Sequence, residues 1–527
     1  MPSIHKPSTT EADLAVIGAG AAGLYAAICA AREGANVVLV SATPLAQTAS
    51  YWAQGGLAAA LAADDSPERH LADTELAGRE LVRHAAAEIL VHEAPGCVED
   101  LQALGVSFDA DRFGRLALGL EGGHSIRRIV HAGGSATGRR VVRQLSALAA
   151  ADPRITVLEG ARARALWTEP DAAPSPTTKP QPAPSPTTAG AGAGRRCRGL
   201  LCQGGHRNGN GSGIRRVVSA RAVVLATGGA AALWARTTNP PGSQGVGLLL
   251  AHAAGAKLAD LELLQFHPTA AIGVFGREGF LVTEAIRGEG ATLHDLTTGE
   301  RFVRELAPRD EVARAIQARL RETGTGAVGL DMRKVDQAHF PNVVAALREA
   351  GLDPARELVP VAPAAHYAMG GIAVDLHARS SVAGLYAVGE VSCTGLHGAN
   401  RLASNSLSEC FVFARRAVAA ALSEPAPVKP TAGAVQALLA TPPLPQATLE
   451  TRAALWQDAG IERTGEGLSR LLHNPHPLVR LIARCALARA ESRGAHLRLD
   501  HPEQDPALDH RHAIVSDGEE VSWETWE

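Results

Sequence analysis

Two histidines and two arginines lie in short motifs that are rich in glycine or marked by proline. They are His267, Arg287, His366 and Arg401. A guanidinium is planar and always charged, so it pairs well with carboxylates, and histidine adds a donor with a tunable charge. Taken singly, each is more simply a satisfied polar residue or a surface ion pair. As a set they predict a site for a small dicarboxylate. Pro268 indicates that a helix stops at His267 and that a loop follows.

Arg309 has an unusual position at the start of a predicted amphipathic helix. Pro308 suits the first helical position, and one face of the helix carries Val312, Ala315, Ile316 and Leu320. A cation at the positive end of a helix dipole costs ~0.3–1 kcal/mol at an exposed site, although Asp310 can offset this. A charge placed against its dipole hints at a functional role.

A glycine turn near the N-terminus predicts a nucleotide site. Gly18-Ala-Gly-Ala-Ala-Gly23 follows a predicted strand, 13–17, and opens a predicted helix, 22–33, before a second strand, 36–41. In such a turn the glycines permit a sharp bend, the approach of a pyrophosphate to the backbone, and close packing of helix on strand. The helix N-terminus then faces the phosphates. The alternative is a purely structural turn. The acidic residue that usually binds the ribose about 20 positions later is absent, so Ser41 or a backbone group is expected there.

Two further glycine turns end buried strands far along the chain. They are Ala226-Thr-Gly-Gly229 and Gly384-Leu-Tyr-Ala-Val-Gly-Glu390. A flavin with an adenine tail touches several strand ends, so this dispersal favours FAD over a nicotinamide dinucleotide. Each piece alone could simply be a strand followed by a turn.

The composition excludes several classes of protein. The net charge of −3 over 527 residues and the 4% of aromatic residues predict no nucleic-acid partner. The uncharged run 14–31 is as long as a membrane span, but its three glycines and Asp13 indicate a strand, a turn and a helix, so no membrane partner is predicted. Seven scattered cysteines form no zinc spacing, which predicts no metal and a reducing, cytoplasmic setting.

The patterning also predicts the organisation of the chain. Residues 1–11 are predicted to be a disordered tail. Residues 170–194 are mostly Pro, Ala, Ser, Thr and Gly and bury too little apolar surface to become ordered, so with the glycine-rich stretch 203–213 they predict a flexible insert over 170–213. Helices are predicted over 68–105, 137–151, 401–421 and 446–495. The tail 498–527 is acidic and lacks a clear pattern.

Together the motifs resemble those of the succinate dehydrogenase and fumarate reductase flavoprotein family. The segments that carry the resemblance are GAGAAG, SYWAQGG, EGGHS, QFHPT, EAIRGEGA, LAPRD, HYAMGG, GLYAVGE and HGANRLASNSL. The resemblance implies an α/β FAD-binding Rossmann-like domain (12–238 and 362–421), an inserted α+β capping domain (239–361), and a C-terminal helical domain and tail (430–527).

Two positions place the chain among the amino-acid-oxidising members of that family. Members in membrane complexes attach the flavin covalently through a histidine shortly before AQGG, where this chain has Ala49, so the FAD is expected to be non-covalent. The dehydrogenases carry glutamine where Glu121 stands, and a carboxylate there suits a substrate ammonium group. The alternative is that Glu121 is a loop acid paired with Arg127 or Arg128. The resemblance thus implies oxidation of L-aspartate to iminoaspartate with oxygen or fumarate as acceptor, feeding quinolinate and NAD biosynthesis, with a possible coupling to quinolinate synthase.

The same resemblance implies a role for each site residue. His267, His366 and Arg401 would hold the substrate carboxylates with Thr283 and Gln265 assisting, Glu121 would orient the amino group, and Arg287 would orient the substrate. Arg309 would transfer the proton, through a relay of Arg287 with Glu284 or Glu289. The FAD would contact Gly18, Ala19, Gly20, Ala21, Ala22, Gly23, Ser41, Ala49, Ser50, Tyr51, Trp52, Ala53, Gln54, Gly55, Gly56, Glu390, Ser404, Ser406 and Leu407.

The chain departs from the family pattern at two positions. Leu120 stands where an arginine commonly precedes EGGHS. Val246 replaces an aspartate in a turn that touches the cofactor, which weakens one contact and leaves the substrate set intact. The rival interpretations are a soluble fumarate reductase or succinate dehydrogenase subunit, a non-catalytic flavoprotein that senses a dicarboxylate, and an ordinary nicotinamide dehydrogenase.

Overall fold

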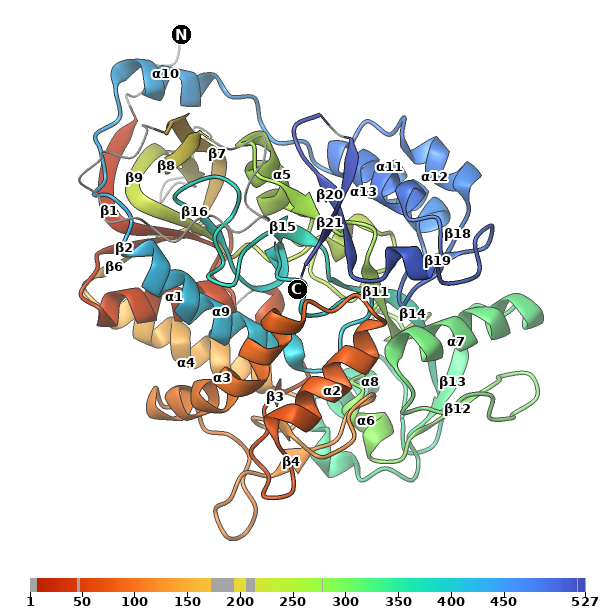
Figure 1. Ribbon diagram of the computed structural model, residues 1–527. Helices are drawn as coiled ribbons and strands as arrows, with labels where there is room; N and C mark the ends of the chain where they lie inside the picture. Colours follow the sequence, from red (N-terminus) through yellow and green to blue (C-terminus); the bar gives the residue numbers. More distant parts are fainter. Residues whose placement is uncertain are drawn as a thin grey trace.

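The computed structural model describes residues 7–44, 48–171, 194–204, 214–276, 278–518 and 520–526. Within these residues, three larger β-sheets and the helices around them form the framework (Figure 1).

The first sheet has seven strands in the order β6-β2-β1-β9-β8-β7, and β16 also pairs with β9. Their bounds are β1 Ser8–Ile17, β2 Val37–Ser41, β6 Ile155–Glu159, β7 Ala161–Pro170, β8 Arg195–Gly204, β9 Ile214–Leu225 and β16 Leu385–Ala387. Strands β6, β2, β1, β9 and β16 run parallel, whereas β8 and β7 are antiparallel additions. The carboxyl ends of β1, β9 and β16 therefore meet at one edge.

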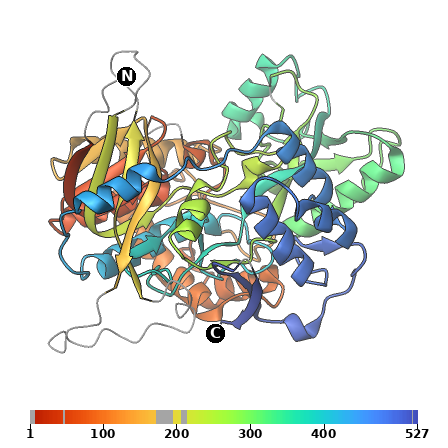
Figure 2. The same ribbon diagram turned by 90° about the horizontal axis from the view of Figure 1, so that it is seen from above.

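Both faces of this sheet are buried, which explains the continuous apolar runs of its parallel strands. Alternate residues of β1 point to opposite faces: Leu14 and Val16 join one hydrophobic core, and Ala15 and Ile17 join another. The first core is completed by α1 (Ala21–Arg32), α3 (His84–Ala103), α4 (Thr137–Ala151) and α9 (Asn405–Ala421). Helix α10 (Ala432–Ala440) packs beside β7, as Figure 2 shows at the end of the molecule away from α7.

The second sheet is antiparallel, in the order β11-β14-β13-β12. It contains β11 (Leu264–Ala271), β12 (Thr292–His294), β13 (Val328–Asp331) and β14 (Val359–Ala368), with α6 (Ala285–Gly288), α7 (Arg309–Thr323) and α8 (Pro341–Glu349) packed around it. The strands of this unit span 264–368, and the predicted capping domain covers 239–361. Strand β14 continues beyond that range through His366, and α5 (Val246–Ala253), which lies within it, packs in the core under the first sheet.

The third sheet joins the middle of the chain to its end, in the order β17-β15-β10-β20-β21. Its strands are β10 (Leu258–Ala259), β15 (Gly371–Ala373), β17 (Ser392–Cys393), β20 (Arg511–Val515) and β21 (Val521–Thr525), beside α11 (Leu449–Asp458), α12 (Gly465–Leu471), α13 (Pro477–Ala488) and the short pair β18 (Glu462–Arg463) and β19 (Leu497–Arg498). The prediction that 498–527 is a patternless tail is therefore wrong at β20 and β21. Residues 512–515 are all buried, so the strand shows no polar alternation.

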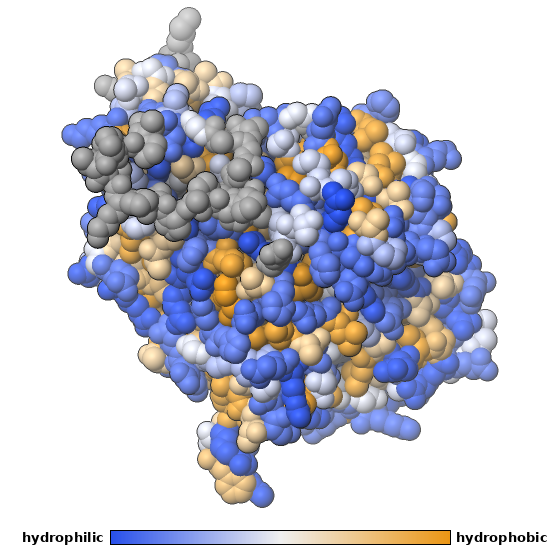
Figure 3. Space-filling model, in the orientation of Figure 1, coloured by the Kyte–Doolittle hydropathy of each residue, from blue (hydrophilic) through white to orange (hydrophobic). Residues whose placement is uncertain are grey.

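Smaller elements connect these sheets. Strands β3 (Leu57–Ala58), β4 (Leu118–Gly119) and β5 (Ile129–Val130) form a three-stranded sheet, and α2 (Pro67–Gly78) precedes α3. One-turn helices cover Ala49–Trp52, Ala231–Leu233, Gln337–His339, Gly389–Val391 and Pro506–Leu508. On the face drawn in Figure 3, hydrophilic side chains surround smaller hydrophobic areas.

Two predictions of disorder are partly wrong. Residues 8–11 belong to β1, where Ser8 to Glu11 pair with Arg216 to Ser219 of β9, and residues 1–6 lie outside the described residues. The predicted insert contains β8, while 172–193 and 205–213 lie outside the described residues. Pairing uses backbone groups, so polar side chains like those of residues 8–11 do not prevent it.

The uncharged run 14–31 forms the end of β1, a glycine turn and α1, as predicted. Across the part of the chain that the structure describes, no helix combines the length and apolarity that crossing a membrane requires.

Candidate active site

Strands β11 and β14 bring three predicted substrate residues together. Gln265 and His267 lie on β11, His366 lies on β14, and Gln265 pairs in register with Tyr367. The predicted loop at Pro268 is wrong, because this proline lies inside β11 at a break in register between His267 and Ala270. At such a bulge a backbone position goes unpaired, so the missing proline N–H costs no ladder hydrogen bond.

The two histidines are neighbours and both are neutral at pH 7. Their ring centroids lie 5.0 Å apart. The Thr269 amide donates to Nδ1 of His267 at 3.2 Å, so the ring proton is on Nε2. Burial, and then the charge of Arg309, holds the pKa of His267 well below its usual value, while burial and Arg401 do the same for His366. Both rings therefore act as neutral hydrogen-bonding groups.

Gln265 holds Arg309, the predicted proton carrier, beside Arg401, a predicted ligand of the substrate carboxylates. Its Oε1 accepts from Nη1 of Arg309 at 3.1 Å and from Nε and Nη2 of Arg401 at 3.2 and 3.1 Å. Its Nε2 donates to Oδ1 of Asn400 at 3.0 Å and to the carbonyl of Arg401 at 2.8 Å. Burial, and then repulsion from Arg309, lowers the pKa of Arg401 to about 10, so this side chain stays charged at neutral pH.

Glu284 connects Arg309 to Arg287. Nε of Arg309 donates to Oε2 of Glu284 at 2.6 Å, and Nη2 of Arg287 lies 3.3 Å from Oε1. Burial alone would raise the pKa of Glu284, but the charges of Arg309 and Arg287 outweigh it and lower the pKa to about 2. Glu289, the other relay candidate, faces Arg127 at 3.6 Å with 40% of its side chain exposed. The geometry thus favours Glu284.

Glu121 does not pair with either nearby arginine, so that alternative is wrong. Arg128 binds Asp65 and Asp73, and Arg127 faces Glu289. Glu121 is 2% exposed; its Oε2 accepts from the hydroxyl of Ser404 at 2.7 Å, and its Oε1 has no hydrogen-bond partner among the described residues. The amide of the next residue, Gly122, donates to Glu284 at 3.0 Å, which joins this loop to the arginine cluster.

The charges of this cluster suit a dicarboxylate that also carries an ammonium group. Arg287, Arg309 and Arg401 are at most 7% exposed and face the carboxyl groups of Glu121 and Glu284. Three guanidinium groups thus face two carboxyl groups, and this excess of cationic side chains complements an anionic ligand. Thr283, 3% exposed, turns the chain into α6 beside this cluster.

The predicted cofactor segments converge at the edge where β1, β9 and β16 end. The turns after these strands contain Gly18, Thr227 and Glu390, and parallel strands bind ligands at their carboxyl ends. Gly18 has φ of +111°, and a side chain there would overlap the carbonyl of Ala226. A side chain on Gly23 would overlap the carbonyl of Gly18, so the helix packs directly on the turn as predicted.

The residues at this edge fit an FAD. Helix α1 begins after Gly20 without a side-chain cap, which leaves its N-terminus for phosphates; the Ala21 amide donates to Oγ of Ser50 at 3.1 Å. Three buried oxygens in or next to the predicted contact segments lack a partner among the described residues: Gln54 Oε1, Thr227 Oγ1 and, just before the segment 49–56, Thr48 Oγ1. Burial raises the pKa of Glu390 to about 7, and its Oε1 accepts from the Ala368 amide at the end of β14.

The other predicted cofactor residues lie around the same edge. Ala49, Ser50, Tyr51 and Trp52 form a single helical turn, and Ala53 to Gly56 follow it. The Tyr51 ring lies under the guanidinium groups of Arg139 and Arg143, and Trp52 is 55% exposed. Ser406 accepts from Arg401 at 2.5 Å, and Leu407 is buried in α9. Ser41 is buried, and its hydroxyl donates to the carbonyl of Thr43. Val246, at the start of α5, is partly exposed.

Three supporting residues escaped the sequence reasoning. Thr238 bonds Nδ1 of His366 at 2.7 Å, Asn400 holds Gln265, and the ring of Tyr367 lies 4.4 Å below the guanidinium of Arg401. Tyr367 lies within the motif HYAMGG and Asn400 within HGANRLASNSL, so their position beside His366 and Arg401 is the signal that could have found them. Nothing around Thr238 distinguishes it in the sequence.

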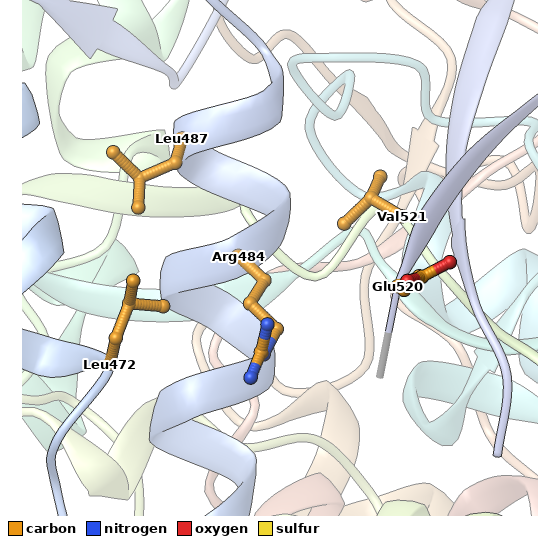
Figure 4. A pocket seen from close by; sticks show the side chains of 5 residues that line it. All are labelled: Leu472, Arg484, Leu487, Glu520 and Val521. Atoms are coloured by element: carbon orange, nitrogen blue, oxygen red, sulfur yellow. The ribbon is translucent and has the colours of Figure 1, made fainter. Parts of the chain in front are cut away.

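A cavity of about 430 Å³ lies apart from this site, between α13 and β21. Figure 4 shows its lining, which is formed by Leu472, Arg484, Leu487, Glu520 and Val521. It shares no residue with the predicted substrate or cofactor sets.

Comparisons with known families and structures define the class. The family described as FAD binding domain matches residues 13–407, and the family described as fumarate reductase flavoprotein C-term matches 470–526. A solved quinol-fumarate reductase with menaquinol molecules is 28% identical with a TM-score of 0.84, covering 99% of this chain and 98% of that one. The E. coli quinol fumarate reductase FrdA is 27% identical with a TM-score of 0.82, covering 99% and 97%. The expected FAD cofactor and FAD-binding fold are thereby confirmed.

Curated relatives narrow the class. The chain is 43% identical to an L-aspartate oxidase of Caulobacter vibrioides over 96% of both chains. It is 40% identical to an L-aspartate oxidase of Streptomyces coelicolor over 97% of this chain and 93% of that one. The chain therefore belongs to the L-aspartate oxidase family of these flavoproteins.

Proposed function

We propose that this chain oxidises L-aspartate to iminoaspartate and thereby supplies quinolinate and NAD biosynthesis. The observation that carries the proposal is the buried Oε1 of Glu121, which finds no hydrogen-bond partner in the described part of the chain, beside three buried arginines. A substrate with two carboxylates and one ammonium group satisfies both features, whereas succinate or fumarate would leave that oxygen unpaired.

When bound, FAD supplies the two-electron acceptance that oxidation of an amine to an imine requires. The residues that would hold it are those of the glycine turn, the segment 49–56, Glu390, Ser404, Ser406 and Leu407, with Ser41 near the ribose. Ala49 offers no nucleophilic side chain, so the cofactor is bound non-covalently.

The substrate carboxylates would bind to His267, His366 and Arg401. The protonated Nε2 of His267 is a donor, Thr283 and Gln265 assist, and Arg287 orients the substrate. Fixing both ends of the molecule holds its reacting carbon in one place, which is an effect of orientation. Neutral imidazoles suit this task because they donate without adding to the repulsion among the arginines.

Arg309 would receive the substrate proton. A guanidinium is essentially always protonated, so it can accept a proton only if it releases another. Nε of Arg309 can release one to Oε2 of Glu284 at 2.6 Å, and Arg287 stabilises the other carboxylate oxygen. The proton would thus pass from the substrate to Arg309, then to Glu284, on a path lined by Arg287.

The unit 264–368 would act as the capping domain. It contributes Gln265, His267, Arg287 and Arg309, whereas Glu121 and Arg401 come from chain segments outside it. Oxygen or fumarate as electron acceptor and a coupling to quinolinate synthase stay predictions. The cytoplasmic location also stays a prediction, supported by seven free thiols.

The Arg309→Leu variant tests the proposal. The purified variant should retain FAD, because Arg309 lies outside the cofactor segments, but should form no iminoaspartate or hydrogen peroxide from L-aspartate under air. Turnover at the wild-type rate would exclude Arg309 as the proton carrier. A wild-type protein that gives neither product aerobically and no iminoaspartate with fumarate would exclude the proposed reaction.

A further inference from the structure

We propose that Ser404 is a positioning residue that fixes the carboxylate of Glu121 and so makes the site selective for a substrate with an ammonium group. This inference rests on the proposed oxidation of L-aspartate and assigns part of its selectivity to a residue outside the arginine and histidine set.

The hydrogen bonds around Ser404 run in one direction only. The Gly56 amide lies 3.1 Å from Oγ of Ser404, and Oε2 of Glu121 lies 2.7 Å from the same oxygen. An amide N–H can only donate, so the hydroxyl oxygen accepts from Gly56. The single hydroxyl proton is then free for Glu121, whose Oε2 must accept it. The backbone of Gly56 thus sets the orientation of the glutamate through the serine.

This arrangement leaves the second oxygen of Glu121 for a ligand. With Oε2 occupied, Oε1 is the buried atom without a partner among the described residues. Gly55 lies next to this oxygen, since a Cβ there would be in van der Waals contact with Oε1 at 3.5 Å. An unpaired, buried carboxylate oxygen is costly, so a ligand that brings a cationic donor gains more than one that does not.

The backbone of Ser404 also indicates that its hydroxyl is needed here. Ser404 has φ of +62°, which serine rarely adopts, and it is 5% exposed. It occupies the N-cap of α9, where serine usually bonds the first helical amides, yet its side chain makes no such bond. The hydroxyl contacts Glu121 and Gly56 instead, at a position where glycine would relieve the strain.

The test compares Ser404→Gly, Glu121→Gln and the double variant as FAD-saturated enzymes. Glycine accepts the positive φ and removes only the hydroxymethyl group. The measurements are KM and kcat for L-aspartate and the dissociation constant of succinate, read from the flavin absorbance. Ser404→Gly should raise KM for L-aspartate about tenfold, as expected for one hydrogen bond to a charged group, and change the succinate constant less than about twofold. In the Glu121→Gln background, Ser404→Gly should change neither the KM for L-aspartate nor the succinate constant any further, because both substitutions act through one carboxylate.

Several outcomes would overturn the inference. One is an equal loss of affinity for L-aspartate and succinate in Ser404→Gly. Another is an unchanged preference for L-aspartate in that variant, and a third is an additive effect in the double variant. If Ser404→Gly and Ser404→Ala both fail to retain FAD, the serine acts through the cofactor that it is expected to contact, and the selectivity assigned to its hydroxyl is excluded. A wild-type enzyme whose flavin is not reduced by L-aspartate would instead contradict the proposed function, which keeps the two failures apart.

Discussion

Replacing Glu284 by glutamine removes the charge that Arg287 and Arg309 share. The folded-state pKa of about 2, against an ordinary 4.5, corresponds to about 3 kcal/mol of stability. Because the pKa is lowered on folding, this contribution is complete above pH 4.5 and is lost as the pH falls toward 2. Removing one partner of a buried ion pair costs a similar ~3–5 kcal/mol. If the chain unfolds as one unit, the midpoint of thermal unfolding should fall by about 3 °C at pH 7.

The same variant interrupts the proposed proton path. With no acceptor at Nε, Arg309 cannot exchange its proton, so kcat for L-aspartate should fall at least about 100-fold, as for other general acid–base groups. KM should stay within about threefold, since the carboxylate-binding residues are untouched. Stopped-flow reduction of the flavin by L-aspartate measures the step directly.

Glu289→Gln is the matched control. Its side chain is two-fifths exposed and faces Arg127, so neither stability nor rate should change. The reasoning is refuted if Glu284→Gln reduces its flavin at the wild-type rate, or if Glu289→Gln loses as much activity.

Three further predictions concern other parts of the site. Glu121→Gln should raise KM for L-aspartate about tenfold in steady-state kinetics and lower the dissociation constant of succinate in a flavin titration. Unchanged constants would exclude the ammonium contact. Tyr367→Leu should raise KM about tenfold by removing the ring below Arg401, while Tyr367→Phe should stay within about threefold; equal effects would exclude the cation–π contact. Burial raises the pKa of Glu390 from 4.5 to about 7, while the charge of Arg401 lowers it and that of Glu409 raises it. Its ionisation in the folded protein therefore costs stability as the pH rises from 4.5 to 7. Glu390→Gln should therefore gain thermal stability over the wild type from pH 5 to pH 8, and a constant difference would contradict this.

The nucleotide edge could be predicted from the sequence because its signals are local. The glycine turn, the apolar strand before it and the helix after it occupy 20 consecutive residues, 13–32, and all three form as predicted. The later turns at 226–229 and 388–390 join the same edge because parallel strands align their carboxyl ends.

The rest depends on contacts between distant residues, which a single sequence does not reveal. Strand β20 pairs with β10 although Val515 and Leu258 are far apart in the chain. Pro268 predicts the end of a helix, whereas it lies in a strand, because the bulge that accommodates it exists only once β14 is in place. Proximity in the sequence offers Arg127 or Arg128 as a partner for Glu121, but its partner is Ser404, at a sequence separation of 283 residues.

The central claim is that the site oxidises L-aspartate in preference to succinate, and anaerobic titration of the FAD-bound protein tests it most directly. L-aspartate should bleach the flavin absorbance and yield iminoaspartate in an amount equal to the flavin that is reduced. Succinate should perturb the spectrum without bleaching it. Bleaching by succinate but not by L-aspartate would contradict the account.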